Sequence, residues 1–227
     1  MKYQILLCDI DDTLFDFHKG EKVALENTFR AFDIPVTPEN WDAYHVANLE
    51  QWRKLELGQT TPQKLRVDRF AEFLKAIGLE RDADAMSDMM VEQLGQQRWP
   101  LPYCVELCQQ VSQHMPIWLV TNGIARVQHS RMENCVLTPY ISGMIISEEM
   151  GVSKPNPKMV WEALAQAGVD DLSRVVFLGD SLSSDIAAAN NAGVDSILFT
   201  NGKEIPEGHK ATYAVKTLEE ACKLILA

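Results

Sequence analysis

Residues 5–14 read Ile-Leu-Leu-Cys-Asp-Ile-Asp-Asp-Thr-Leu, an apolar run typical of a buried strand that ends in two carboxylates spaced i, i+2. Because side chains alternate between the faces of a strand, we expect Asp9 and Asp11 to project the same way from its carboxyl end. Two crowded carboxylates repel each other as anions, which favours protonation of one or the binding of a divalent cation. Such a pair can supply a nucleophile and a general acid. Acidic residues after a strand also commonly begin a turn or cap a helix.

Three further polar sites lie downstream, and two of them also follow short apolar runs. They are Thr-Asn-Gly at 121–123, Ser-Lys-Pro-Asn-Pro at 153–157, and the segment 179–185, which contains Asp180 and Asp185. In an open α/β sheet the carboxyl ends of the strands line the ligand crevice. We therefore expect carboxylates, a hydroxyl group and a lysine to converge at one place.

The bulk composition restricts the class of partner. The chain has 227 residues, 46% hydrophobic and 23% charged, which suits one sizeable domain or a core with a smaller module. Its net charge of −11 argues against binding to a nucleic acid polymer or an anionic membrane, but not against a small phosphorylated substrate. No apolar stretch reaches membrane-spanning length, and the amino terminus does not read as a signal peptide. The 5 scattered cysteines predict reduced thiols and a cytoplasmic location.

The chain divides into a helical block and an alternating region. Helical spacing covers 19–32, 39–56, 62–77 and 82–97, with breaks at 35–38, at 58–62 and at Gly78, and with Thr37 and Thr61 as helix starts. From residue 102 onward helices and strands alternate. Helices are expected at 103–113, 124–135, 157–167, 184–192 and 217–226, and strands at 116–120, 143–147, 174–179 and 195–199. This alternation predicts an α/β fold, a Rossmann-like doubly wound parallel sheet, built from 1–15 and 100–227, with an all-helical domain at 16–99 inserted after the first strand.

The four motifs, Asp9-Ile10-Asp11-Asp12-Thr13, Thr121-Asn122-Gly123, Lys154-Pro155 and Gly179 through Asp185, resemble the signature motifs of the haloacid dehalogenase-like superfamily, in the same order. The resemblance implies that the helical block is a cap domain. It also implies a two-step phosphatase reaction, in which Asp9 attacks phosphorus and becomes an aspartyl phosphate. Asp11 would protonate the leaving oxygen and then activate water for hydrolysis of the intermediate.

The resemblance further implies an Mg²⁺ cofactor and a phosphate site. Mg²⁺ prefers oxygen ligands, which Asp9, the main-chain carbonyl of Asp11, Asp180 and Asp185 (directly or through a water molecule) would supply. Thr121, with the main-chain N–H groups of Asn122 and Gly123, and the Lys154 ammonium would bind the phosphate. Asp12 is expected to be a turn residue rather than a third acid.

Substrate choice is expected to lie in the cap. Trp41, Tyr44, Asn48 and Trp52 fall near one helical face, which favours either an aromatic core of the cap or a flat pocket. In the pocket interpretation Asn48 hydrogen-bonds the edge of a base and Trp52 stacks on it. The chain length, the cap size, this segment and residues 143–151 are similar to the pyrimidine 5′-nucleotidases of the superfamily. This implies a nucleoside monophosphate as substrate. Phosphoglycolate, a sugar phosphate or another small phosphorylated metabolite is the alternative.

Other functional classes fit the residues less well. A dehalogenase would not need Asp11, Asp180 and a metal together, and a sugar-phosphate mutase needs further cap residues that the sequence does not reveal. A phospho-accepting receiver domain, which is not an enzyme, combines similar residues but is shorter and has no helical insertion. Many turnovers on p-nitrophenyl phosphate would distinguish an enzyme from a receiver. The protein is expected to be a monomer or a homodimer.

Overall fold

The chain folds into two compact units. The computed structural model describes residues 1–57, 59–133 and 135–227. Residues 1–18 and 98–227 form one unit, here called the α/β unit, and residues 19–97 form the other, the helical unit. The limits predicted from the sequence, with the inserted block at 16–99, differ from these by a few residues. The assignment of the inserted block as a cap domain stays a prediction.

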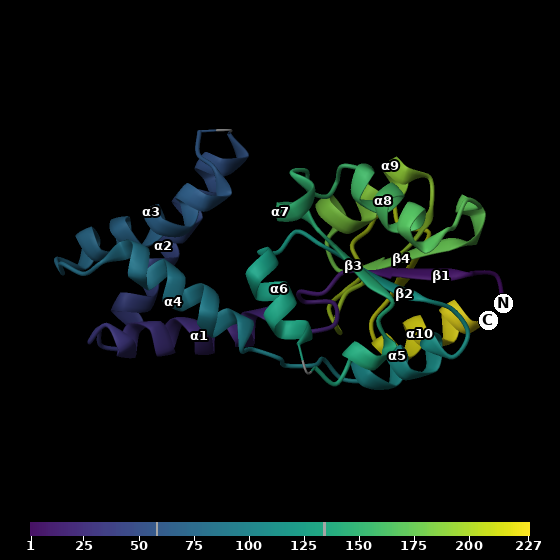
Figure 1. Cartoon of the computed structure of the whole chain (residues 1–227), viewed down its shortest axis with the longest axis horizontal. Helices are drawn as coiled ribbons and strands as arrows, with labels where there is room; N and C mark the ends of the chain where they lie inside the picture. The colour runs from purple at the N-terminus through teal and green to yellow at the C-terminus, as the bar shows by residue number, and fades with distance from the viewer. Residues whose placement is uncertain (58, 134) are drawn as a thin grey trace. The chain divides into compact units, whose positions relative to one another are not determined.

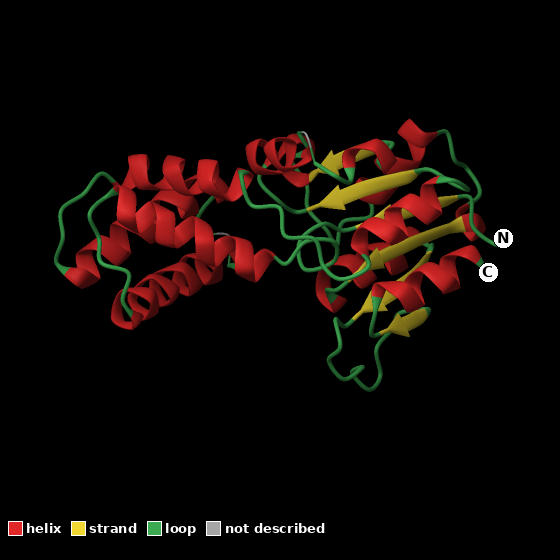
Figure 2. Ribbon diagram, turned by 90° about the horizontal axis from the view of Figure 1, so that it is seen from below, coloured by secondary structure: helices red, strands yellow, loops and turns green. Residues whose placement is uncertain are grey.

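The α/β unit is built on a parallel sheet. Within the described residues its strands are β1 (Ile5–Cys8), β2 (Ile117–Thr121), β3 (Gly143–Ile146), β4 (Val175–Gly179), β5 (Asp195–Phe199) and β6 (Tyr213–Val215). They lie in the order β3-β2-β1-β4-β5-β6, and every pairing is parallel (Figures 1 and 2). The sequence did not predict β6, because three residues are too few for a recognisable alternation. The predicted parallel sheet is confirmed.

Helices cover both faces of the sheet. Leu6 and Cys8 of β1 belong to the hydrophobic core that contains residues of α5 (Cys104–Ser112) and α10 (Leu218–Leu226). Ile5 and Leu7 point to the opposite face, where they share a core with α8 (Lys158–Ala167) and α9 (Ala187–Ala192). Figure 1 shows these two helix pairs on opposite sides of the strands. All four residues of β1 are buried, because the strand is apolar on both faces, so the predicted doubly wound, Rossmann-like fold is confirmed.

Two predicted helices differ in detail from the structure. The helix expected at 124–135 is α6 (Ala125–Met132), and Asn134, which the prediction included, lies outside the described residues. The helix expected at 184–192 begins earlier, as a π-helical turn at Leu182–Ile186 that continues into α9. Periodicity did not reveal the short α7 (Ser147–Met150) or the 3₁₀ turns Thr138–Tyr140 and Leu172–Arg174, because each is about one turn long.

The helical unit contains most of α1 (Phe17–Ala31), together with α2 (Pro38–Glu56), α3 (Pro62–Ile77) and α4 (Ala83–Gly95). The predicted helix starts are confirmed, since the hydroxyl of Thr37 accepts from the N–H of Asn40 and that of Thr61 from the N–H of Lys64. At the predicted break, Gly78 ends α3 with a φ of 68°, a conformation that glycine adopts without strain. Gly58, in the other predicted break, lies outside the described residues.

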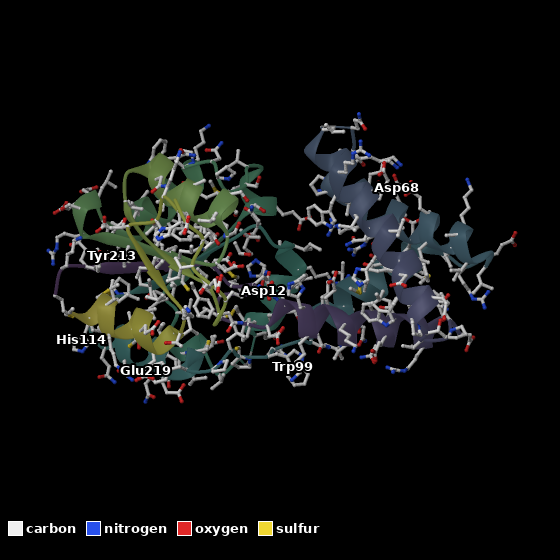
Figure 3. The ribbon with its side chains drawn as sticks, turned by 180° about the vertical axis from the view of Figure 1, so that it is seen from behind. Asp12, Asp68, Trp99, His114, Tyr213 and Glu219 are labelled. Carbon is white, nitrogen blue, oxygen red and sulfur yellow. The ribbon has the colours of Figure 1, made fainter. Side chains whose placement is uncertain are left out.

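The polar motifs lie at the carboxyl edge of the sheet. Asp9 follows β1 directly, Thr121 is the last residue of β2, and Asp180 follows β4. In Figure 3, Asp12 marks this end of the α/β unit, whereas His114 and Tyr213, which precede or begin strands, lie at its opposite end. The topology therefore brings the motifs to one edge, as expected for ligand sites of open α/β sheets.

Candidate active site

Asp9 and Asp185 lie on either side of the Lys154 ammonium group. Lys154 Nζ donates to Asp9 Oδ1 at 2.5 Å, to Asp185 Oδ1 at 2.7 Å and to the main-chain carbonyl of Val120 at 2.7 Å. The side chains are 1%, 9% and 2% exposed for Lys154, Asp9 and Asp185, so this cluster is largely withdrawn from water. All three donor positions of the ammonium are used, which fixes a side chain that is otherwise flexible.

Burial and charge act in opposite directions on this cluster. Burial raises the pKa of Asp9 well above its usual range, and the neighbouring Asp185 and Asp11 carboxylates raise it further, although Lys154 opposes them. Burial alone would lower the pKa of Lys154, but Asp9 and Asp185 raise it above its ordinary value. Lys154 is therefore a cation. One lysine next to two buried carboxylates leaves an excess of negative charge.

Asp180 adds a third carboxylate to this excess. One carboxylate oxygen from each of Asp9, Asp180 and Asp185 lies within 4.8 Å of the others. Burial, followed by the nearby Asp185 and Asp12, raises the pKa of Asp180 to about 6. The close approach of Asp185 requires Gly179, because a Cβ at that position would lie 2.4 Å from the Cβ of Asp185. Three converging hard oxygen donors with uncompensated charge fit a divalent cation such as Mg²⁺.

The side chain of Asn122 holds the backbone of Lys154. Its Oδ1 accepts from the Lys154 N–H at 2.8 Å, and its Nδ2 donates to the Lys154 carbonyl at 3.0 Å. These two hydrogen bonds resemble the pair that two residues on neighbouring β-strands exchange, and they fix the loop that carries the lysine. The sequence predicts Asn122 as a phosphate-binding residue through its main-chain N–H. It gave no indication that the side chain positions Lys154.

Thr121 is buried at the end of β2, with 1% of its surface exposed. Its Oγ1 accepts from the N–H of Gly123 at 3.0 Å and lies 3.4 Å from Nε2 of Gln128. A Cβ at position 123 would lie 2.2 Å from Gln128 Nε2, so a glycine is needed for Gln128 to approach. The predicted phosphate-binding residues 121–123 thus form a compact turn, packed against a glutamine that sequence reasoning missed.

Asp11 is half-buried, and side chains of α6 (Ala125–Met132) donate hydrogen bonds to its carboxylate. Its Oδ2 accepts from Gln128 Nε2 at 2.8 Å, and its Oδ1 forms an ion pair with Arg131 Nη1. Gln128 and Arg131 both belong to α6, and each is 1% exposed. Gln128 and Arg131 are about one helical turn apart on the helix that follows the Thr121 motif, but nothing in the sequence indicates that they contact Asp11.

Asp12 behaves as the turn residue that the sequence predicts. It has a φ of 60°, and its Oδ1 accepts from the main-chain N–H of Phe17 at 3.0 Å, at the start of α1. A cavity of about 500 Å³ lies beside it, with Asp180, Leu182, Phe199 and Lys203 among its lining residues. The candidate metal site therefore borders a cavity that belongs to the α/β unit alone.

The predicted specificity residues lie on α2 in the helical unit. Tyr44 is fully buried among Phe29, Phe70 and Phe73, with a centroid distance of 5.3 Å to Phe70, so this part of the stripe forms an aromatic core. Asn48, one turn later, is half-buried, and its Oδ1 accepts from Arg69 at 3.3 Å. Trp52 is 48% exposed. The aromatic stripe of α2, formed by Tyr44, Asn48 and Trp52, is therefore buried at Tyr44 and becomes exposed to solvent toward Trp52.

A doubly wound α/β unit with a carboxylate nucleophile candidate, a buried lysine and an acidic trio at its carboxyl edge is the architecture of one family of hydrolases. The chain belongs to this family, because the model of the haloacid dehalogenase-like hydrolases matches residues 3–193. The chain is 32% identical over 226 residues to the pyrimidine 5′-nucleotidase YjjG of Escherichia coli (strain K12), with 99% of each chain covered. It is also 31% identical over 202 residues to the pyrimidine 5′-nucleotidase PynA of Streptococcus pneumoniae (strain ATCC BAA-255 / R6), covering 88% of this chain and 84% of that protein.

Solved structures agree with the family assignment. The structure of YfnB from Bacillus subtilis, described as a candidate HAD-hydrolase bound to magnesium, superposes with a TM-score of 0.89 at 27% identity and full coverage of both chains. The predicted family, and its likeness to the pyrimidine 5′-nucleotidases, are thereby confirmed. A membrane span is not found either, since no helix among the described residues is both long enough and apolar enough to cross a bilayer.

Proposed function

We propose that this enzyme is an Mg²⁺-dependent pyrimidine nucleoside 5′-monophosphate phosphatase that acts through an aspartyl phosphate on Asp9. The predicted general class, a phosphoric monoester hydrolase, is the class of the named relatives, and the chain is an enzyme of that class. The observation that carries the proposal is the buried Lys154 ammonium between Asp9 and Asp185, beside the third carboxylate of Asp180. A carboxylate nucleophile close to a cation can approach a phosphate dianion, which an isolated carboxylate would repel.

Each residue of the site has its own role in the proposed reaction. Asp9 attacks phosphorus, and the ester oxygen leaves with a proton from Asp11. Asp11, now a carboxylate, takes a proton from the water that hydrolyses the acyl phosphate, and Asp9 is regenerated. Thr121 and the N–H groups of Asn122 and Gly123 bind the nonbridging oxygens, while Lys154 offsets their charge.

Asp9, Asp180 and Asp185 would hold Mg²⁺, with the main-chain carbonyl of Asp11 as a further predicted ligand. When bound, the cation would neutralise the charge of the carboxylates and of the phosphoryl group. The oxygen-only donor set and the raised pKa values of Asp9 and Asp180 support this assignment. Asp180→Ala should therefore raise the Mg²⁺ concentration needed for half-maximal activity, and an unchanged requirement would place the metal elsewhere.

The pyrimidine nucleotide is proposed because two relatives that cover most of the chain are named pyrimidine 5′-nucleotidases. Asn48 and Trp52 are proposed to contribute to recognition of the base by hydrogen bonding and by stacking. A panel of UMP, dUMP, dTMP, purine nucleotides, sugar phosphates and phosphoglycolate, assayed for kcat/KM with Mg²⁺ and with EDTA, tests the whole proposal. A sugar phosphate or phosphoglycolate at the head of the panel would overturn the nucleotide assignment, and equal activity in EDTA would overturn the metal.

A further inference from the structure

The carboxylate of Asp11 is held by two side chains of α6 that have no part in the reaction outlined above. Arg131 Nη1 donates to Oδ1, and Gln128 Nε2 donates to Oδ2 at 2.8 Å. Residues three apart on a helix project from the same face, so both donors reach Asp11 from one direction. Because each oxygen accepts one hydrogen bond, the plane of the carboxylate is fixed as well as its position, and each oxygen keeps a second lone pair that can carry a proton.

The guanidinium group of Arg131 is buried. The side chain is 1% exposed, and its Cζ lies 5.8 Å from the ring centroids of both Phe15 and Phe17. Its Nε has no hydrogen-bond partner among the described residues. A buried cation is strongly unfavourable unless it is paired, and the ion pair of Arg131 is with Asp11. The buried charge of Arg131 is therefore compensated by the carboxylate of Asp11.

Gln128 connects Asp11 to the predicted phosphate site. The same Nε2 atom that donates to Asp11 lies 3.4 Å from Oγ1 of Thr121. The distance between Asp11 Oδ2 and Thr121 Oγ1 therefore cannot exceed the sum of these two distances. A Cβ at position 123 would overlap the side-chain amide of Gln128, so the glycine leaves room for this amide. Gln128 therefore holds the distance between the proton-transfer group and the group expected to bind phosphate.

We propose that Arg131 and Gln128 are positioning residues, which hold Asp11 in the orientation from which it exchanges protons with the leaving oxygen and with water. The inference rests on the proposed phosphatase function. In the first half-reaction, the bond from Asp9 to phosphorus forms, the ester P–O bond breaks, and the proton of Asp11 passes to the leaving oxygen. In the second, Asp11 takes a proton from water as the water oxygen bonds to phosphorus and the bond to Asp9 breaks. A displacement of about 1 Å of such a group costs about 100-fold in rate.

The test is a double-mutant cycle between Arg131 and Asp11. We expect Arg131→Met to lower kcat on UMP by about 100-fold and to change KM by less than about twofold. The loss on p-nitrophenyl phosphate should be smaller, because nitrophenolate leaves without a proton. In the Asp11→Asn background the same substitution should lower kcat by less than about twofold further, because the group that it positions is already disabled. Arg131→Lys should restore part of the rate.

Two further variants complete the design. Arg126→Met replaces an exposed arginine of the same helix and should leave kcat unchanged. Gln128→Met removes the second donor without creating a buried charge. It should show the same dependence on leaving group and on Asp11, so it carries the test if Arg131→Met does not fold. Thermal denaturation of each variant measures its folding separately from its rate.

The outcomes distinguish the inference from the proposed function. Multiplicative losses from Arg131→Met and Asp11→Asn, or equal losses on both substrates, would overturn the positioning role in an active phosphatase. A wild-type enzyme that hydrolyses no phosphomonoester would overturn the proposed function and the inference together. Loss of the Arg131→Met effect in the Asp11→Asn background, with partial rescue by Arg131→Lys, would support the inference.

Discussion

Asp180 should destabilise the metal-free fold, and removing its charge should stabilise it. Burial and neighbouring carboxylates raise the pKa of Asp180 from 3.8 to about 6. Each unit of difference between folded and unfolded states corresponds to about 1.4 kcal/mol, or about 3 kcal/mol here at pH 7.5. Asp180 is partly exposed, so we reduce the expectation to about 1–2 kcal/mol for solvent screening. Asp180→Asn should therefore raise the Tm in EDTA by about 2–8 °C.

The sign of this effect depends on pH and on metal. The raised pKa means that the folded state disfavours the carboxylate, so the penalty is complete above about pH 6 and absent below the unfolded value of 3.8. The gain from Asp180→Asn should thus shrink between pH 7.5 and pH 4. In saturating Mg²⁺ the order should reverse, because the variant loses a ligand and with it the stabilisation by bound cation.

Thermal and urea denaturation in EDTA at the two pH values provide the measurement. Asp170→Asn, at an exposed carboxylate of the same unit, is the matched control and should change the Tm little at either pH. The electrostatic reasoning would be refuted if Asp180→Asn is no more stable than the wild type at pH 7.5 in EDTA. It would also be refuted by a gain of equal size at pH 4.

Three further predictions concern individual side chains. Asp9→Asn should lower phosphate release by at least about a thousandfold while the Tm is retained, and substantial turnover in that variant would contradict covalent catalysis. Asn122→Ala removes two hydrogen bonds to the Lys154 backbone and should lower the free energy of unfolding by about 1 kcal/mol, with a loss of kcat that urea titration and steady-state kinetics can compare. Asn48→Ala should lower kcat/KM on UMP and leave p-nitrophenyl phosphate nearly unaffected, whereas Glu50→Ala, at an exposed position of the same helix, should affect neither. Equal losses on both substrates would exclude a role of Asn48 in recognising the base.

The ends of buried strands could be predicted from sequence, but the partners of their side chains could not. Asp9, Thr121 and Asp180 each follow a continuous apolar run, and parallel pairing brings such ends together whatever the rest of the chain does. The ion pair of Asp11 with Arg131 joins residues far apart in the chain, and helical periodicity shows only that position 131 lies on a buried face. The same limit applies to the side chain of Asn122, whose pairing with Lys154 depends on how two loops meet.

The aromatic stripe of α2 shows a second limit. The spacing placed Tyr44, Asn48 and Trp52 on one helical face, and left open whether that face forms a core or a pocket. In the structure it does not have one environment, because Tyr44 is buried and Trp52 is 48% exposed. One face of a long helix can be buried along part of its length and exposed along the rest. Helical periodicity does not show at which residue the burial ends.

The interruption of the α/β unit by the helical unit has a consequence for how the protein is made. The central strand β1 is synthesised before its neighbours β2 (Ile117–Thr121) and β4 (Val175–Gly179), so it has no partner strand until the whole helical unit and β2 have been made. The helical unit is continuous in sequence, and α3 packs against its sequence neighbours α2 and α4, which favours its earlier folding. Pulse-labelling hydrogen exchange should therefore show protected amides in α2 and α3 before those of β1, and the reverse order would contradict this account. Asp9 and Lys154 would then come together only after the helical unit and β2 have been made, because Lys154 follows both in the sequence.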